Sequence, residues 1–526
     1  MDLQLLIAVN IMVISGLAIV LGLLQRAKHQ GWLIAVHAAI LAAGALALAL
    51  GWSQPGTIVA GLFIPLIIVP GTFTWLATRR SNMGENQAAA HYSRWAAVFH
   101  PSPNARLTAK LAQAQAHDDP DQRAAALRSL TEGMPPTQKA VSEALASRAE
   151  GRWGDVLGII RSDATAGELL RGLEIRALGE LGRVDEMVGV YTDNKTRLQG
   201  TDLRNSQLFV FAFCGRDRAV ELLLDTKRPV FDAPTVAYWK TIAAFYSGNN
   251  RDRARAALEN LAAADERPLT RAAAARHLSQ APVTERGVLS AASQAEIDAL
   301  ETRLVRDAPL RDMRLRRCPV TLALLIANSA MFALEASRGD AEDLQTLFDL
   351  GALWPPAVLQ LGQWWRLATA LFLHFGWAHF MINMLSLMAL GRFVETAFGS
   401  LRMLVIYVIA GLGSMASVLG LMHTGMIEPS ILVGASGAIM GLFGAIVARQ
   451  LRNWMNSRDV LDRRGLIALS VIMAVQVAAD FSIPNVSFAG HASGFAFGFI
   501  MALGLGSLMP KAGVIKTMKR SDRLVD

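Results

Sequence analysis

Charged residues and cysteines are both scarce in this chain of 526 residues. Only 18% of the residues are charged and 52% are hydrophobic, whereas a soluble domain usually carries about 25% charged residues. The two cysteines, Cys214 and Cys318, belong to no metal or redox motif. They therefore support neither a disulfide framework nor a zinc site. The low charge is typical of a protein with several membrane spans.

The chain is nevertheless basic, with a formal net charge of +8. Its basic residues gather beside apolar segments, at Arg79–Arg80, Arg314–Arg317, Arg463–Arg464 and Lys516–Arg520. Basic clusters next to membrane spans set the orientation of a membrane protein, because they stay on the cytoplasmic side. The charge is thereby accounted for, and we expect no nucleic-acid partner.

The apolar residues form nine segments that approach the roughly 20 residues needed to cross about 30 Å of hydrocarbon. Three open the chain, at 3–24, 31–51 and 56–77, and six follow residue 317, at 319–337, 370–392, 402–423, 434–450, 465–481 and 488–508. The first has no basic leader and no cleavage site, so we expect an uncleaved span. The distribution of Lys and Arg predicts an external amino terminus and a cytoplasmic carboxyl tail.

A polar segment, residues 79–317, separates the two membrane regions and has apolar residues at helical spacing. Glycine-containing turns recur at Gly151, Gly182, Gly215 and Gly248, in steps of 31, 33 and 33 residues. This period is typical of stacked helix pairs of the tetratricopeptide kind, and an irregular helical domain is the alternative. Its histidines lack metal-ligand spacing, so we do not expect a second catalytic centre. A stacked helical array offers a concave surface, so we expect an accessory module that binds a cytoplasmic protein or peptide.

The sequence therefore predicts an all-α, polytopic membrane protein with four parts. These are three transmembrane helices (1–78), a cytoplasmic helical-repeat domain (79–317), a core of six transmembrane helices (318–510) and a basic cytoplasmic tail (511–526). The expected location is a bacterial cytoplasmic (inner) membrane.

Polar side chains inside membrane spans are costly and indicate function. Three such clusters lie at the starts of the second, fourth and sixth core segments: His379 with Asn383, Ser436, and His491. All three segments run from outside to inside in the predicted topology. The four side chains are therefore expected in one layer, a few Å (about one helical turn) below the outer surface.

Glycines suggest how these clusters meet. Gly434, Gly437, Gly441 and Gly444 share one helical face, and Gly494 and Gly498 share the face of His491. Small-residue faces let membrane helices approach closely, which would bring Ser436 within reach of His491. A serine beside an imidazole is an activated nucleophile. His379 and Asn383, at i and i+4, would then help the Ser436 backbone N–H to form an oxyanion hole.

The less specific alternatives are packing and interfacial roles. A lone Gly-x-Ser-Gly in a membrane helix is usually a packing motif, and a lone histidine is usually an interfacial residue. Asp480 lies near the outer end of the fifth segment and is assigned to the interface, so the prediction is a Ser-His dyad without an acidic member. No metal and no cofactor are expected.

Residues 319–508 resemble the rhomboid family of intramembrane serine proteases. The resemblance rests on the six-helix order, on His374, His379 and Asn383, on Gly434-Ala435-Ser436-Gly437, and on His491 with Gly494 and Gly498. Trp365-Arg366 is similar to the Trp-Arg pair that helps to place the family's first loop in the membrane, and Glu395 also fits the pattern. Met440 departs from it, because an aromatic residue often stands there.

The resemblance implies an endopeptidase that cleaves transmembrane segments of other proteins near the outer face, with Ser436 and His491 as catalytic residues. Three alternatives remain. They are a catalytically silent relative that binds membrane clients, a scaffold that recruits partners through the repeat domain, and a transporter. The silent relative usually lacks the serine or the histidine, and a transporter needs paired sites in two repeats.

Overall fold

The computed structural model describes residues 31–99, 103–198, 200–225, 230–248, 251–265, 267–279, 289–311, 313–482 and 487–506, with a few residues between 8 and 19. These residues form helices and turns, with one isolated β-bridge between Leu353 and Leu432. The all-α prediction is confirmed. The chain divides into two compact units, residues 22–305 and residues 306–526 with 1–21. Each unit is described by itself below.

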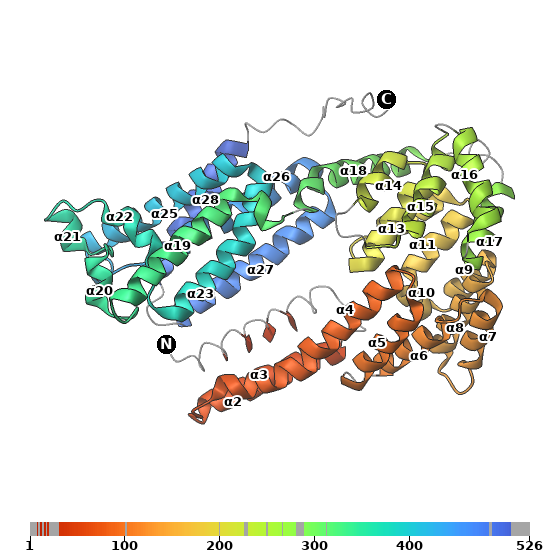
Figure 1. Cartoon of the computed structure of the whole chain (residues 1–526), viewed down its shortest axis with the longest axis horizontal. Helices are drawn as coiled ribbons and strands as arrows, with labels where there is room; N and C mark the ends of the chain where they lie inside the picture. Colours follow the sequence, from red (N-terminus) through yellow and green to blue (C-terminus); the bar gives the residue numbers. More distant parts are fainter. Residues whose placement is uncertain are drawn as a thin grey trace. The chain divides into compact units, whose positions relative to one another are not determined.

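The second unit contains the membrane core (Figure 1). Its main helices are α19 (Pro319–Arg338), α23 (Gly376–Ser386), α24 (Arg392–Phe398), α25 (Ser400–His423), α26 (Ser436–Ser457), α27 (Val460–Ser482) and α28 (Phe488–Gly506). A π-helical turn, Leu387–Gly391, joins α23 to α24. The first half of α26 is buried on all sides, from Gly437 to Ala445, so this helix is the centre of the core.

Six helices are long and apolar enough to cross a membrane among the described residues, compared with nine expected spans. They are Pro55–Asn82, Pro319–Arg338, Gly376–Phe398, Ser400–His423, Val460–Phe481 and Phe488–Leu505. The segment at 31–51 forms α2 (Gly31–Ala49), whose apolar part is shorter. The segment at 434–450 forms α26, which is long enough but carries Arg449 and Arg452. Most of the segment at 3–24 lies outside the described residues.

Buried polar side chains hold the helix ends and loops of the core. Glu395 accepts hydrogen bonds from the backbone N–H groups of Val320 (3.0 Å) and Thr321 (2.8 Å), so it caps the start of α19. Arg366 donates to the carbonyls of Phe348 (2.7 Å) and Ala352 (3.0 Å). It thereby anchors the loop that contains α20 (Leu344–Asp349), α21 (Pro355–Leu359) and α22 (Arg366–Thr369). Trp365 beside it is half exposed, at 51%.

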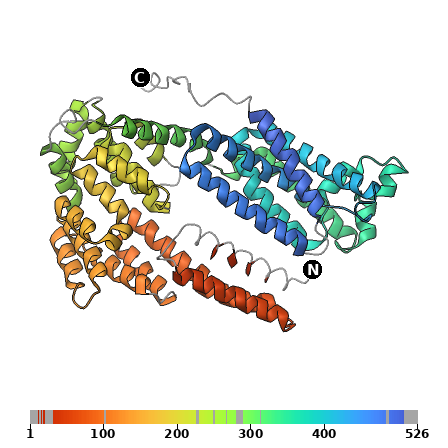
Figure 2. The same cartoon turned by 180° about the vertical axis from the view of Figure 1, so that it is seen from behind.

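The first unit begins with α2, and α3 (Pro55–Phe63), a π turn and α4 (Val69–Asn82) then form one continuous helix. Helices arranged as hairpins follow (Figure 2). They are α5 (Asn86–Phe99), α6 (Pro103–Ala114), α7 (Pro120–Ser129), α8 (Pro136–Ala149), α9 (Trp153–Ser162), α10 (Ala164–Leu169), α11 (Arg171–Glu180), α12 (Val184–Asn194), α13 (Gly200–Phe213), α14 (Asp217–Leu224), α15 (Ala233–Ser247), α16 (Arg251–Ala264), α17 (Pro268–Ser279) and α18 (Ala291–Asp307).

The four recurring glycines lie at equivalent places in this unit. Gly151, Gly182, Gly215 and Gly248 have φ angles of 73°, 74°, 68° and 75°. Each follows the first helix of a pair, where a left-handed residue ends the helix and glycine adopts that conformation without strain. The periodic glycines therefore mark helix pairs. Assignment to the tetratricopeptide family stays a prediction, as do the four domain boundaries.

Candidate active site

Ser436 and His379 meet across Gly434, at the start of α26. A Cβ atom on Gly434 would lie 2.9 Å from Cε1 and 3.1 Å from Nε2 of His379, and 3.6 Å from Oγ of Ser436. Gly434 has a φ of 128°, which other residues rarely adopt. Glycine is thus required here for two reasons, and its lack of a side chain leaves room between the serine and the imidazole.

The hydrogen bonds of His379 determine which of its ring nitrogens carries the proton. The backbone N–H of Phe375 donates to Nδ1 of His379 at 3.3 Å. A neutral imidazole that accepts at Nδ1 carries its proton on Nε2. His379 therefore presents an N–H donor beside Gly434 and Ser436. The amide of Asn383 donates to the carbonyl of His379 at 3.1 Å, so one of its two N–H groups is occupied within α23.

The two glycine faces pack against each other, as the sequence predicted. A side chain on Gly494 would strike the backbone of Gly437, and one on Gly498 would strike the backbone of Gly441. In the opposite direction, a Cβ atom on Gly441 would lie 3.1 Å from the carbonyl oxygen of Gly494. Backbones this close are possible only between glycines. The contact places the start of α28, with His491, beside the start of α26, with Ser436.

His491 also contacts a carboxylate. Its Nδ1 lies 2.9 Å from Oδ1 of Asp480, and Gln476 donates to the same oxygen at 2.8 Å. Asp480 is buried, with 6% of its surface exposed. The sequence analysis assigned Asp480 to the interface, but the residue is buried against His491, so this placement was wrong. The Ser-His dyad without an acidic member stays a prediction. An Nδ1–H that donates to Asp480 leaves the Nε2 lone pair of His491 free to accept a proton.

Further polar groups support this site. His374 is fully buried, its ring centroid lies 5.4 Å from that of His379, and its backbone N–H donates to Glu335 at 3.1 Å. Glu335, a buried carboxylate within α19, was not recognised from the sequence. Ser414 of α25 donates to the carbonyl of Gly490 at 2.7 Å and fixes the start of α28. No hydrogen bond joins Ser436 to His491, and catalytic pairs are often loose before substrate binds.

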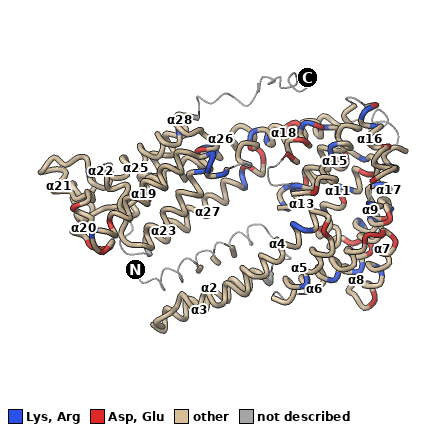
Figure 3. The backbone as a smooth tube through the Cα atoms, in the orientation of Figure 1, with Lys and Arg blue, Asp and Glu red and all other residues tan. Residues whose placement is uncertain are grey.

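No cluster of three or more His, Cys, Asp and Glu side chains within the described parts of the chain has the arrangement of a metal site. The long helices α19, α25 and α28 also contain very few charged residues (Figure 3). The functional groups described near Ser436 are a hydroxyl, two imidazoles, a carboxylate, the amide of Asn383 and backbone amides.

Comparison with known proteins identifies the family of this unit. The family model of the rhomboid domain matches residues 361–508, which include Ser436 and His491. The putative rhomboid protease YdcA of Bacillus subtilis is 32% identical over 144 residues, which are 27% of this chain and 67% of that protein. The chain belongs to the rhomboid family. With six membrane-length helices, it is a multi-pass membrane protein.

Two further rhomboid relatives match less of their own length. The rhomboid protease GluP of Bacillus subtilis is 37% identical over 184 residues, which are 35% of this chain and 34% of that protein. RHOMBOID-like protein 5 of Arabidopsis thaliana is 36% identical over 173 residues, which are 33% of this chain and 53% of that protein. The chain thus spans only about a third to a half of the length of these two relatives. About two thirds of this chain lies outside each match.

Proposed function

We propose that the chain is an intramembrane serine endopeptidase that hydrolyses peptide bonds in or near the transmembrane segments of other membrane proteins. Ser436 is the nucleophile and His491 is the base. The observation that supports this proposal most strongly is the convergence of Ser436 with the Nε2–H of His379, beside a glycine contact that brings in His491. Rhomboid proteins of Bacillus subtilis that carry the name protease add support.

Each of these groups has a defined role in the proposed reaction. Nε2 of His491 takes the proton of the Ser436 hydroxyl while Oγ attacks the scissile carbonyl carbon. The oxyanion of the tetrahedral intermediate accepts hydrogen bonds from Nε2–H of His379, from the Ser436 backbone N–H and from Asn383. His491 then gives its proton to the leaving amine, and water hydrolyses the acyl-enzyme by the same steps. Ser436 begins α26, where the helix dipole also favours negative charge.

Asp480 has a positioning role in this proposal. A carboxylate on Nδ1–H holds the imidazole in the tautomer that presents a basic Nε2, and it stabilises the imidazolium that forms. Asp480 does not touch the substrate. The proposed site is therefore a Ser-His pair whose histidine is oriented by an aspartate, with Gln476 holding that aspartate in turn.

Replacement of the nucleophile tests the proposal. Ser436→Ala should abolish cleavage of a transmembrane reporter in proteoliposomes while the protein stays folded and inserted. Ser493→Ala is the matched control, because the Ser493 hydroxyl donates only to carbonyls of its own helix, and it should keep full activity. Wild-type turnover by Ser436→Ala would exclude this mechanism. A wild-type protein without activity on any reporter would favour the client-binding relative instead.

The proposed orientation follows the distribution of basic residues. The helical-repeat domain and the carboxyl tail are cytoplasmic, the amino terminus is outside, and the catalytic layer lies near the outer face. The partners are transmembrane substrates and the lipid bilayer, and we propose a bacterial inner membrane as the location.

A further inference from the structure

A large cavity lies within the unit of residues 22–305, far from the catalytic serine in the sequence. Its volume is about 1490 Å³. Its walls combine the end of α4 with residues of α5, α6, α7, α8, α11, α13, α15 and α17. Because these segments are far apart in the chain, no local motif in the sequence predicts the cavity.

Arginines dominate the charge of the cavity wall. Five line it: Arg123, Arg148, Arg176, Arg267 and Arg276. The carboxylates of the lining are Asp118, Asp121 and Glu150. Glu150 accepts hydrogen bonds from Arg128 at 2.6 Å and from Arg152 at 2.8 Å, and neither of these arginines lines the cavity. Among the lining residues themselves, five arginines therefore stand against three carboxylates.

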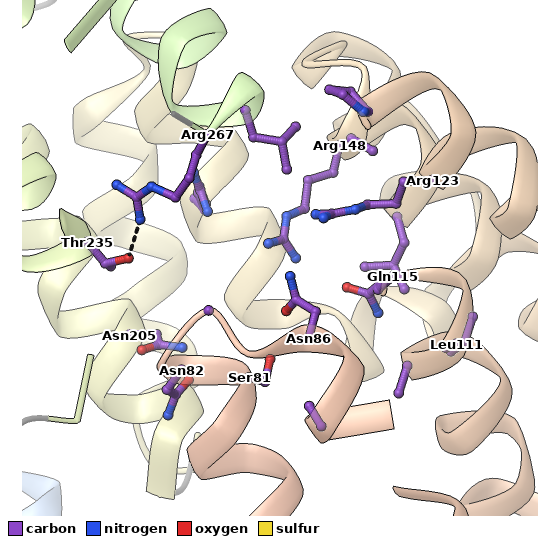
Figure 4. A pocket seen from close by; sticks show the side chains of 18 of the residues that line it. Ser81, Asn82, Asn86, Leu111, Gln115, Arg123, Arg148, Asn205, Thr235 and Arg267 are labelled. Atoms are coloured by element: carbon purple, nitrogen blue, oxygen red, sulfur yellow. Dashed lines mark hydrogen bonds between the residues drawn. The ribbon is translucent and has the colours of Figure 1, made fainter. Parts of the chain in front are cut away.

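Most of these arginines already have a partner, but Arg148 does not. Arg267 pairs with Asp265 at 3.1 Å, and Arg176 pairs with Glu180 at 3.3 Å. Arg148 makes no hydrogen bond or ion pair within the described residues. In Figure 4 the side chains of Arg148 and Arg123 reach toward each other from neighbouring helices, and the amide of Asn86 faces Arg148. The arrangement brings like charges together.

The surroundings of Arg148 disfavour its charge. Burial and the nearby guanidinium groups of Arg176 and Arg123 lower the pKa of Arg148 to about 9, against a smaller opposite effect of Glu180. At that pKa the guanidinium remains charged at neutral pH. An uncompensated charge in such a place destabilises the ligand-free protein, unless an anion occupies the site.

The same wall contains buried polar atoms without partners. They are Nε1 of Trp153, Oδ1 of Asn205, the hydroxyl of Tyr238 and Nε of Arg276. A buried polar atom without a hydrogen bond costs about 1–3 kcal/mol, so proteins usually avoid them. Three of these four atoms belong to residues outside the arginine cluster, so they are a separate observation, and they also point to a polar ligand.

We infer that this cavity binds an acidic peptide segment, with Arg148 as the central contact to a carboxylate. Planar guanidinium groups recognise carboxylates through paired hydrogen bonds. Amide side chains that both donate and accept, from Asn82, Asn86, Gln115 and Asn205, suit a peptide backbone. The volume exceeds the roughly 300–1,000 Å³ of a small-molecule pocket, which favours an extended segment over a single inorganic anion.

The position of the cavity indicates which peptides it meets. Thr78, Ser81 and Asn82 line it from the last turns of a helix that is long and apolar enough to cross a membrane. The cavity therefore lies at the end of a span, where the segment following a client's own span is also found. This step rests on the proposed protease, and it predicts that clients with acidic residues after their transmembrane helix are held at high local concentration.

Binding can be measured without cleavage, on full-length Ser436→Ala protein in nanodiscs of neutral lipid. A fluorescent peptide rich in aspartate and glutamate should bind, and its amidated Asn/Gln counterpart should not. Arg148→Gln should weaken binding about tenfold or more, while the ligand-free protein becomes no less stable. Arg255→Gln is the matched control, because Arg255 is exposed and pairs with Glu259 on α16.

Two results would overturn the inference. One is that the acidic peptide loses its selectivity, so that it binds Arg148→Gln as tightly as the parent protein or no more tightly than the amidated peptide does. The other is binding of phosphatidylglycerol vesicles that depends on Arg148 when the peptide does not bind, which would identify a lipid headgroup site. A failure of the acidic peptide to bind leaves the protease proposal intact, because the Ser436→Ala experiment measures cleavage separately.

Discussion

Glycine has opposite roles in the two units of this protein. In the unit of residues 22–305, Gly151, Gly182, Gly215 and Gly248 end helices with positive φ angles. In the rhomboid unit, Gly441, Gly494 and Gly498 lie inside helices and let backbones touch. The first role depends on conformational freedom and the second on the absence of a side chain. The spacing in the sequence distinguishes them, because turns recur at the length of a helix pair and contacts recur at helical periods.

The two units also differ in how many charged groups they contain and where these groups lie. The hairpin unit contains many ion pairs and a cavity lined by arginines. In the rhomboid unit, buried polar groups such as His374, Glu395 and Asp480 are few and lie among apolar helices. Water screens charges in the first unit, whereas in a membrane each polar group needs a defined partner. Substitutions should therefore have larger effects in the rhomboid unit than in the hairpins.

Alanine at a glycine of each kind tests this contrast most directly. Gly494→Ala should reduce cleavage to background, because the new methyl group would strike the backbone of Gly437 and force α28 away from α26. Gly248→Ala is the matched change in a hairpin. Nothing lies within 4 Å of its Cβ position, so only strain of about 1–2 kcal/mol is expected. Full activity of Gly494→Ala would contradict the role of the glycine contact.

Asp480 provides the next largest effect. Asp480→Asn should lower kcat by about 100- to 10,000-fold, because the amide no longer fixes the tautomer of His491. KM should change little, since Asp480 does not contact the substrate. Asp480→Glu should recover part of the activity. If Asp480→Asn lowered the thermal stability but left kcat unchanged, the carboxylate would be structural and the site would be a simple dyad.

Asn383 should matter less than His491. Asn383→Ala removes one donor of several and should lower kcat by about 10- to 1,000-fold. His491→Ala should reduce activity as far as Ser436→Ala does, because these two residues act as a unit. Turnover of the same reporter in proteoliposomes should be measured in parallel for Asn383→Ala, His491→Ala and Ser436→Ala. An Asn383→Ala variant as inactive as His491→Ala would require a different assignment of roles.

The sequence predicted the parts of this protein that depend on spacing along one helix. It predicted the turn glycines and the facing glycines, because helical periodicity determines which residues share a face. It predicted the proximity of His379 to Ser436 from the topology, which puts the starts of these two helices at one depth. It failed for Asp480, which lies 11 residues before His491 on another helix, because the rotation of α27 depends on packing. Arg148 was missed for the same reason, since its cavity is assembled from segments far apart in the chain.

The smallest expected effect concerns an ion pair at the surface of the hairpin unit. Glu150 accepts two hydrogen bonds from Arg128, at 2.6 and 2.7 Å. Mainly through these bonds, the pKa of Glu150 falls from 4.5 to about 2. A carboxylate with a depressed pKa stabilises the folded state above its ordinary pKa, and this contribution is lost as the pH falls through the folded-state value. The relevant window is therefore pH 4.5 to about 2.

The size of this effect is limited by solvent. Arg128 remains 36% exposed and Glu150 22% exposed, so we expect only about 0.5 kcal/mol. Amide hydrogen exchange in α8, compared between the parent protein and Glu150→Gln at the same pH, measures it. The variant should exchange faster at pH 6, and the difference should vanish near pH 2. A difference that persists at pH 2 would mean that Glu150 stabilises α8 by packing, so the hairpins would depend less on charge than their many ion pairs suggest.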